Sequence, residues 1–284
     1  MSTFQETRFI LPHITLAARE YGPADGIPVL ALHGWLDNAM TFERVAPHLS
    51  GVRLVMLDMA GHGLSEHRSA GSSYPIWDYA RDALLVADQL GWERFALLGH
   101  SLGAITAALL AASVPERITR LALIDGLFPL IEEPEHAPAR LGGALRAELA
   151  LARKRKPVYA DIEQAVRARV LGGFPVSREA AELLASRGLI ACEGGFTWCT
   201  DARLTLPSAY RVTRAQAHAF IRAIRCPVCF VAAENGLLIE PEEWALLREL
   251  SFDIKQLAGG HHLHLDSAES AQQVAACFAD FLLE

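Results

Sequence analysis

The stretch LLGHSLGA, residues 97–104, decides how this chain is organised. An apolar run stops at Gly99, Ser101 stands between two glycines, and an apolar pattern of helical spacing begins immediately afterwards. A strand that turns so sharply into a helix leaves no room for side chains on either side of the corner. The turn would hold the serine hydroxyl in the open beside a helix N-terminus, where developing negative charge is favoured. The alternative interpretation is a serine that simply caps the helix.

The first 125 residues alternate between strand-like and helix-like patterns. Continuous apolar strands separated by helices predict a parallel sheet that is covered on both faces. In such sheets, ligands bind at the carboxyl ends of the strands. Strands are expected at 13–20, 28–34, 53–58, 95–99 and 120–125, and helices at 39–50, 79–91 and 101–115.

The alternation stops for a long stretch in the second half of the chain. Residues 127–216 are helix-like and loop-like, with no convincing strand, and they are too many for a plain connection. We therefore predict a core formed by residues 1–126 and 217–284, with a helical cap inserted at 127–216. In the second part of the core, helices are expected at 217–224, 241–250 and 268–283, and strands at 226–233 and 252–258.

Composition and charge limit the classes of protein to which the chain can belong. With 284 residues, 51% of them hydrophobic, it can bury a large core without disulfides or metal ions. A net charge of −7 without a basic stripe argues against a nucleic-acid partner. The one basic cluster, residues 153–156, is interpreted as a solvated helix end, with an anion site as the alternative. The polar N-terminal segment and the lack of a long apolar run predict a cytoplasmic protein without membrane insertion. The expected partner is a small-molecule acyl substrate.

The cysteines and clustered histidines do not predict a metal or redox site. Five cysteines are an odd number, which argues against a disulfide framework. Cys226 and Cys229 have the C-x-x-C spacing of redox motifs, but they open a strand-like run rather than a helix. His261, His262 and His264 have no carboxylate or cysteine beside them at ligand spacing. We therefore expect no metal and no cofactor.

A serine at such a corner can act as a nucleophile only with a base, which in turn needs an acid to orient it. The base should follow the last strand, where the chain reads LAGGHHLHLDSAE, residues 257–269. His261 comes directly after two glycines that allow its ring to turn back over the sheet edge, so we expect it to be the base. His262 and His264 are interpreted as polar surface residues.

Two backbone amides are expected to form an oxyanion hole, the group of donors that stabilises the negative charge of an acyl-transfer transition state. One is the N–H of Leu102, the residue after the serine. The other is the N–H of Trp35 in ALHGWLDN, residues 31–38, where a glycine at the strand end lets the backbone turn toward the site.

Several segments of the chain occur in the order and spacing of a known superfamily. They are HGWLDN (33–38), DMAGHGLS (58–65), LLGHSLG (97–103), the long insertion and GGHHLHLD (259–266). With them the chain resembles the α/β-hydrolase superfamily and, in detail, the serine hydrolase-like proteins. The resemblance implies an α/β-hydrolase fold: an eight-stranded, mostly parallel sheet flanked by helices, with a helical cap over the serine. It also implies that Asp58 and His62 are chiefly structural.

The orienting acid is where the chain departs from the common pattern of this superfamily. In that pattern the acid follows the seventh strand, but here VAAENGLLIE, residues 231–240, carries Gly236 at the corresponding position. Glu234 is near but two residues early. The other location known in the superfamily is the end of the sixth strand, which in this sequence is Asp125. We expect Asp125 to be the acid, with Glu234 as the alternative.

These residues together predict acyl transfer to water, with a carboxylic ester as the expected substrate. A thioesterase, an amidase or a carbon–carbon bond hydrolase would use the same residues. A serine at the corner argues against the dehalogenases and epoxide hydrolases of the superfamily, which carry an aspartate there. Two further alternatives are a non-catalytic ligand-binding protein that kept the fold and a cofactor-free peroxidase.

Overall fold

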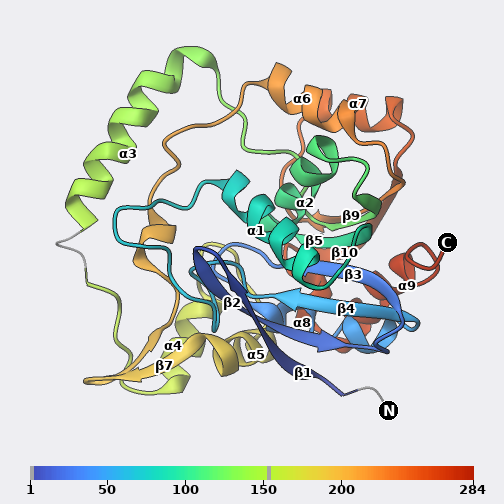
Figure 1. Ribbon diagram of the computed structural model, residues 1–284. Coiled ribbons are helices and arrows are strands. Elements are labelled where there is room, and N and C mark those ends of the chain that lie inside the picture. The colour runs from blue at the N-terminus through green and yellow to red at the C-terminus, as the bar shows by residue number, and fades with distance from the viewer. Residues whose placement is uncertain (1–2, 152–154) are drawn as a thin grey trace.

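The centre of the protein is a single eight-stranded sheet. A computed structural model describes residues 3–151 and 155–284 (Figure 1). The strand order is β1-β2-β4-β3-β5-β6-β9-β10. β1 and β2 pair antiparallel, as do β2 and β4, and all other pairs are parallel. The strands are β1 (Gln5–Leu11), β2 (Ile14–Tyr21), β3 (Ile27–Leu32), β4 (Val52–Leu57), β5 (Phe95–His100), β6 (Ile118–Ile124), β9 (Val228–Asn235) and β10 (Asp253–Gly260).

Helices cover both faces of this sheet, which explains why its central strands are continuously apolar. In β5, Phe95 and Leu97 contribute to one core while Ala96 and Leu98 contribute to the other. The first core lies under four helices: α1 (Ile76–Gln89), α2 (Leu102–Ser113), α6 (Arg214–Ala223) and α7 (Pro241–Glu249). The second lies under α9 (Ala268–Phe278) and the short helices η1 (Ala39–Phe42) and η2 (Ala46–His48).

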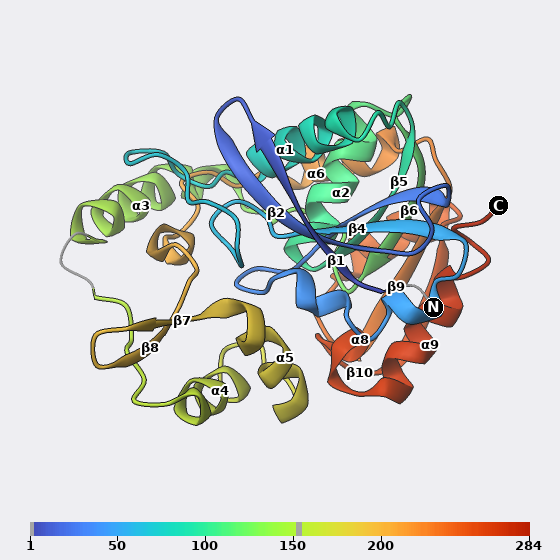
Figure 2. The ribbon, with the colours of Figure 1, turned by 60° about the horizontal axis from the view of Figure 1, so that its bottom comes forward.

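A long segment between β6 and α6 lies to one side of the sheet, away from the C-terminus (Figure 2). We call it the cap. Part of it has its own small core, in which Val166, Ala181 and Leu184 are buried. Its elements are η3 (Pro134–His136), α3 (Ala137–Leu151), α4 (Ile162–Val170), α5 (Arg178–Gly188), β7 (Leu189–Cys192), β8 (Gly195–Trp198) and η4 (Ala202–Thr205).

The eight-stranded, mostly parallel sheet confirms the fold class expected from the sequence, but three local expectations are wrong. The helix expected at 39–50 is instead η1 and η2, because Pro47 lacks the N–H that a continuous helix needs. The segment expected to lack strands contains the β7–β8 hairpin, whose turn uses positive φ angles at Gly194 and Gly195. β1 precedes the first expected strand, in the part of the polar and alternating N-terminal segment for which no strand is expected.

In the described part of the chain, no helix combines the length and the apolar character needed to cross a bilayer.

Candidate active site

Ser101 lies on a strained turn between β5 and α2. Its φ of 51° and ψ of −117° fall outside the regions that L-residues ordinarily occupy. A Cβ atom at Gly99 would lie less than 3.0 Å from the backbone of Ala104, and one at Gly103 would lie closer still to the carbonyl group of Leu32. Both glycines are therefore required by the close approach of α2 to β3 and β5.

The structure brings Ser101, His261 and Asp125 into one hydrogen-bonded chain. Ser101 Oγ lies 2.9 Å from His261 Nε2, and His261 Nδ1 lies 2.6 Å from Asp125 Oδ2. His261 follows the end of β10, and Asp125 follows the end of β6, the strand that neighbours β5. Because the carboxylate accepts the Nδ1 proton, Nε2 is left to accept the proton of the serine hydroxyl.

The carboxylate of Asp125 is held by more than the histidine. It accepts hydrogen bonds from the amides of Ala233, at 3.0 Å, and Leu237, at 2.9 Å. A Cβ atom on Gly236 would overlap this carboxylate, so the glycine makes room for it. Glu234, at the exposed end of β9, does not reach His261 within hydrogen-bond distance. Of the two candidate acids, the structure therefore places Asp125 at the histidine.

The two amides expected to form an oxyanion hole lie in neighbouring segments. Leu102 is the first residue of α2, and Trp35 lies in the loop after β3, the strand on which the N-terminus of α2 packs through Gly103. Among the described residues, neither amide has a hydrogen-bond acceptor. Two free N–H groups in adjacent segments are what an oxyanion hole requires.

The comparisons with known proteins agree with this arrangement. A family model described as the alpha/beta hydrolase fold matches residues 27–156. A serine hydrolase-like protein from Dictyostelium discoideum is 30% identical over 278 residues, covering 92% of this chain and 77% of the relative. The chain belongs to the α/β-hydrolase superfamily.

Solved structures also resemble this hydrolase along nearly its whole length. A hypothetical protein from Pseudomonas aeruginosa PAO1 is 60% identical, with a TM-score of 0.96 over 99% of this chain and 100% of that chain. A thioesterase domain from the curacin biosynthetic pathway is 25% identical, with a TM-score of 0.83 over 96% of this chain and 99% of that chain. The resemblance to α/β hydrolases, and to serine hydrolase-like proteins in particular, is confirmed.

The interpretation of His262 and His264 as surface residues is wrong, because the hydrolase buries both. His264 packs beneath the site, where its Nε2 lies 2.8 Å from the hydroxyl of Thr41. Burial lowers the pKa of His264 well below its usual value and that of His100, the residue before the nucleophile, to about 4. His100 Nε2 donates to the carbonyl oxygen of His261, at 2.9 Å, and so supports the backbone of the proposed base.

Asp37 was absent from the expected site residues, yet the hydrolase places it at the centre of this histidine cluster. Its Oδ2 accepts from His262 Nε2 at 3.1 Å, and its Oδ1 accepts from Arg169 Nη2 of the cap at 2.9 Å. Burial alone would raise the pKa of Asp37, but the nearby positive charges and hydrogen bonds hold it well below its usual value. No sequence signal links these residues, because Asp37 and His262 are 225 positions apart.

Three ligand atoms in this cluster, from Asp37, His100 and His262, lie within 4.8 Å of one another. Such a set has the size of a metal site. The guanidinium of Arg169, however, already supplies the positive charge beside the carboxylate, and its Nη2 lies 3.2 Å from His262 Nε2. The cluster is thus built around an ion pair between core and cap.

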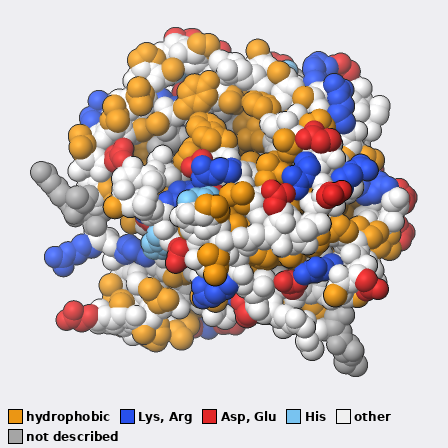
Figure 3. All heavy atoms as spheres, viewed as in Figure 1, with side chains coloured by type: hydrophobic (Ala, Val, Ile, Leu, Met, Phe, Trp, Pro, Cys, Tyr) orange, Lys and Arg blue, Asp and Glu red, His pale blue; other side chains and the backbone are white. Residues whose placement is uncertain are grey.

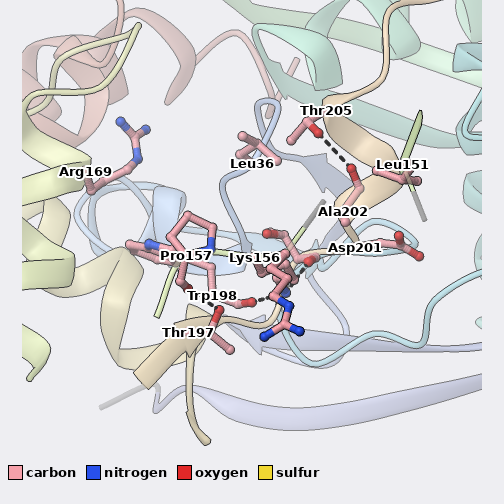
Figure 4. Close-up of a pocket in the computed structure, with 12 residues that line it drawn as sticks. Leu36, Leu151, Lys156, Pro157, Arg169, Thr197, Trp198, Asp201, Ala202 and Thr205 are labelled. Atoms are coloured by element: carbon pink, nitrogen blue, oxygen red, sulfur yellow. Dashed lines mark hydrogen bonds between the residues drawn. The ribbon is translucent and has the colours of Figure 1, made fainter. Parts of the chain in front are cut away.

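Two pockets of the hydrolase adjoin the loops of the site. One, of about 240 Å³, lies between Leu36 and the cap and is drawn in Figure 4. Arg155 and Lys156 line it, while Arg153 and Lys154 of the basic cluster lie outside the described residues. The Lys156 ammonium, interpreted as part of a solvated helix end, is instead half-buried and donates to the carbonyl oxygens of Trp198 and Thr200.

The other pocket, of about 380 Å³, opens beside the proposed base. It is lined by Phe174 of the cap and by His261, whose rings lie 4.9 Å apart between centroids. The surface of the hydrolase is also hollowed between α3 and α6, where hydrophobic side chains gather (Figure 3). At the pocket beside His261, the cap thus contributes Phe174 and Pro175 to the lining.

Cys226 and Cys229, the C-x-x-C pair, lie far from this chemistry. Both thiols are unpaired at the start of β9, and burial raises their pKa values to about 11 and about 12. Thiols with such pKa values stay protonated near neutral pH and are poor nucleophiles. Asp58, expected to be structural, accepts hydrogen bonds from the amides of Ala39 and Leu64.

Proposed function

We propose that this hydrolase cleaves a carboxylic ester through an acyl-enzyme formed on Ser101. The observation that carries the proposal is the hydrogen-bonded chain from Ser101 through His261 to Asp125. In this proposal His261 is the general base and Asp125 the orienting acid. The backbone amides of Trp35 and Leu102 form the oxyanion hole.

The proposed reaction follows from the positions of the protons. Ser101 Oγ attacks the ester carbonyl carbon while its proton passes to His261 Nε2, and the carbonyl oxygen becomes an oxyanion. Asp125 stabilises the imidazolium that forms. Collapse of the tetrahedral intermediate breaks the ester bond, and the imidazolium gives its proton to the leaving alcohol. Water, deprotonated by His261, then attacks the acyl-enzyme and releases the carboxylic acid and the free serine.

The pockets support a small-molecule substrate. Cavities of about 240 and 380 Å³ are within or below the usual range for drug-sized ligands. The cap lies between solvent and the loops of the site, so we expect short soluble esters to be hydrolysed faster than long-chain triglyceride emulsions. A series of p-nitrophenyl esters of increasing acyl length would define the preference.

Covalent labelling tests the nucleophile directly. A fluorophosphonate probe should label the wild-type protein on Ser101, identified by peptide mass spectrometry, and should not label Ser101→Ala. Turnover of the best p-nitrophenyl ester should fall by about 10³-fold or more in this variant, with its thermal unfolding unchanged. Near-wild-type turnover by Ser101→Ala would refute the mechanism, and an unlabelled, inactive wild type would favour a non-catalytic binding protein.

A thioester is the second candidate substrate. It is favoured by the likeness to the thioesterase domain from the curacin pathway, which extends over nearly the whole chain. Matched ester and thioester substrates with the same acyl group separate the two candidates. A kcat/KM at least tenfold higher for the thioester would move the assignment to thioesterase, with the same residues in the same roles.

A further inference from the structure

The loop after β3, residues 33–38, is tied to the cap by three of its side chains. It carries Trp35, the proposed oxyanion donor. We propose that the cap positions this loop, so that the seating of the cap on the core sets how well the oxyanion hole works. Arg169, on the cap, is then a positioning residue for the reaction. The inference rests on the proposed function and adds to it a structural requirement that the cap supplies.

The three ties reach three different elements of the cap. Trp35 Nε1 donates to the carbonyl oxygen of Leu204 in η4 at 2.8 Å. Arg169 Nη2 of α4 donates to Asp37 Oδ1 at 2.9 Å. Asn38 Nδ2 donates to the carbonyl oxygen of Leu184 in α5, also at 2.9 Å. Since the three ties start from different residues of the loop and end on different elements of the cap, we expect them together to restrict the movement of the loop.

The central tie is an ion pair that strongly favours one position of the cap. Asp37 is 1% exposed. Among the described residues of the cap, only Arg169 of α4 forms an ion pair with it. Moving α4 away would leave a buried carboxylate with only His100 and His262 beside it. Removing one partner of a buried ion pair is strongly destabilising, because the other charge stays buried without an opposite charge beside it.

The loop needs such restraint because its backbone is strained. Leu36, between two of the tied residues, has a φ of +61°, which is unusual for a residue with a branched side chain. Strained conformations of this kind persist only where the surrounding structure over-determines them. Leu36 also lines the pocket between core and cap, so a ligand there contacts the strained residue itself.

The same arginine reaches the other side of the site. Arg169 Nη1 donates to the carbonyl oxygen of Phe174 at 2.8 Å, and the ring of Phe174 lies on that of His261. The guanidinium of Arg169 therefore connects the loop after β3 with the cap segment at Phe174, beside the proposed base. Weakening this connection should disturb the transition state more than the binding of substrate, because the oxyanion forms only during the reaction.

The test compares two variants that cut different ties. Arg169→Met removes the charge and the N–H donors and leaves a shorter, unbranched apolar side chain, while Trp35→Phe removes the indole N–H and part of the ring but keeps an aromatic side chain. Arg178→Met is the matched control, because Arg178 pairs with Glu163 and Glu182 on the exposed surface of the cap. The readouts are kcat and KM for a short p-nitrophenyl ester, and the Ki of a trifluoromethyl ketone, whose serine adduct places an oxyanion in the hole.

We expect kcat to fall about 10- to 100-fold in Arg169→Met and less in Trp35→Phe, since a misplacement of about 1 Å can cost 10²-fold. KM should stay within about threefold of wild type, and the Ki of the ketone should rise with the loss in kcat. Arg178→Met should match the wild type in all three. Arg169→Lys should recover part of the loss, since an ammonium can replace the charge but not both hydrogen bonds.

Two results would overturn the inference. One is an unchanged kcat and Ki in Trp35→Phe and Arg169→Met; the other is a rise in KM alone, which would show that the cap only binds substrate. If Arg169→Met does not fold, Trp35→Phe decides, because it leaves the buried ion pair intact. A wild type that resists the fluorophosphonate and hydrolyses no ester would refute the proposed function, whereas an active wild type with unaffected variants would refute only the coupling.

Discussion

The absence of a side chain at Gly236 leaves the space that the Asp125 carboxylate occupies. Gly236 stands where the superfamily commonly has its acid, and a Cβ there would overlap the Asp125 carboxylate. The amides of Ala233 and Leu237 on either side both donate to that carboxylate. The turn after β9 therefore still receives a carboxylate, which is contributed by β6.

The acid can be tested by changing the carboxylates one at a time. Asp125→Asn should lose most ester turnover, since the corresponding change in a serine protease lowers kcat about 10⁴-fold by stabilising the wrong imidazole tautomer. Glu234→Gln should lose little, because Glu234 is exposed and distant from the histidine's hydrogen bonds. Steady-state kinetics with a p-nitrophenyl ester would measure both; the reverse ranking would move the acid to β9.

The space at position 236 provides an independent check of the same assignment. Gly236→Ala should lower kcat by displacing the Asp125 carboxylate, although it changes no ionisable group. Gly173→Ala is the control, because Gly173 lines the same pocket and a Cβ there meets nothing within 4 Å. Equal kcat values for the two variants would show that the carboxylate does not depend on the glycine.

At the scale of elements, the position of the serine depends on how closely α2 approaches the sheet. The N-terminus of this helix lies against the end of β3, with only hydrogen at Gly103 facing the carbonyl group of Leu32. The same contact brings the Leu102 amide close to the loop after β3, residues 33–38. In α3, by contrast, Gly143 faces open space.

These two helical glycines should respond in opposite ways to the same substitution. Gly103→Ala should lower the free energy of unfolding, because α2 or β3 must move to relieve the overlap, and activity should fall with it. Gly143→Ala should raise the free energy of unfolding by about 0.5–1 kcal/mol, the usual gain for an exposed helical site. Urea denaturation measures both changes, and a neutral Gly103→Ala would contradict the close packing.

At the scale of the whole molecule, the hydrolase keeps several histidines neutral in its interior. Burial lowers the pKa of His62 to about 3 and that of His100 to about 4, and it also lowers the pKa values of His33 and His264. In the unfolded chain these groups bind protons with pKa values near ~6.5. Folding therefore excludes protons that the unfolded chain would bind in mildly acidic solution.

This difference predicts that the protein loses stability as the pH falls from about 6.5 toward 4. Over that range the unfolded state binds more protons, and each excluded proton lowers the free energy of unfolding by about 1.4 kcal/mol per pH unit. The buried carboxylates Asp37, whose pKa lies well below its usual value, and Asp201, whose pKa is about 2, lose their stabilising contribution mainly below this range, because the unfolded chain protonates aspartate only near pH ~3.9. Thermal unfolding measured at pH 5.0 and 7.5 checks the sign.

A pair of histidine variants identifies the groups responsible. His62→Asn should flatten the pH dependence, because it removes a buried titratable ring while keeping a donor for the carbonyl oxygen of Ala60. His136→Asn, at an exposed position in η3, should leave the dependence unchanged. The same slope in both variants would assign the acid sensitivity to other groups.

The sequence by itself determined those features that depend on neighbouring residues. Continuous apolar runs report strands buried on both faces, and the glycines around Ser101 report a turn that only small residues permit. The fold class, the strand that carries Ser101 and a histidine after the last strand could be predicted in this way, whereas Asp125 and Glu234 were candidates for the acid only through the resemblance to the superfamily. The apolar spacing at 39–50 predicts one helix, but Pro47 within it interrupts the helix in the structure.

What only the tertiary structure decided are contacts between segments that no local pattern connects. Of the two candidate acids, Asp125 lies within hydrogen-bond distance of His261, and the absence of a Cβ at Gly236 leaves room for its carboxylate. The side chain of Asp37 accepts hydrogen bonds both from His262, which lies 225 positions away, and from Arg169 of the cap. Periodicity reports how much of a side chain is buried but not against which partner, because the partner is brought there by strand order and by the packing of the cap.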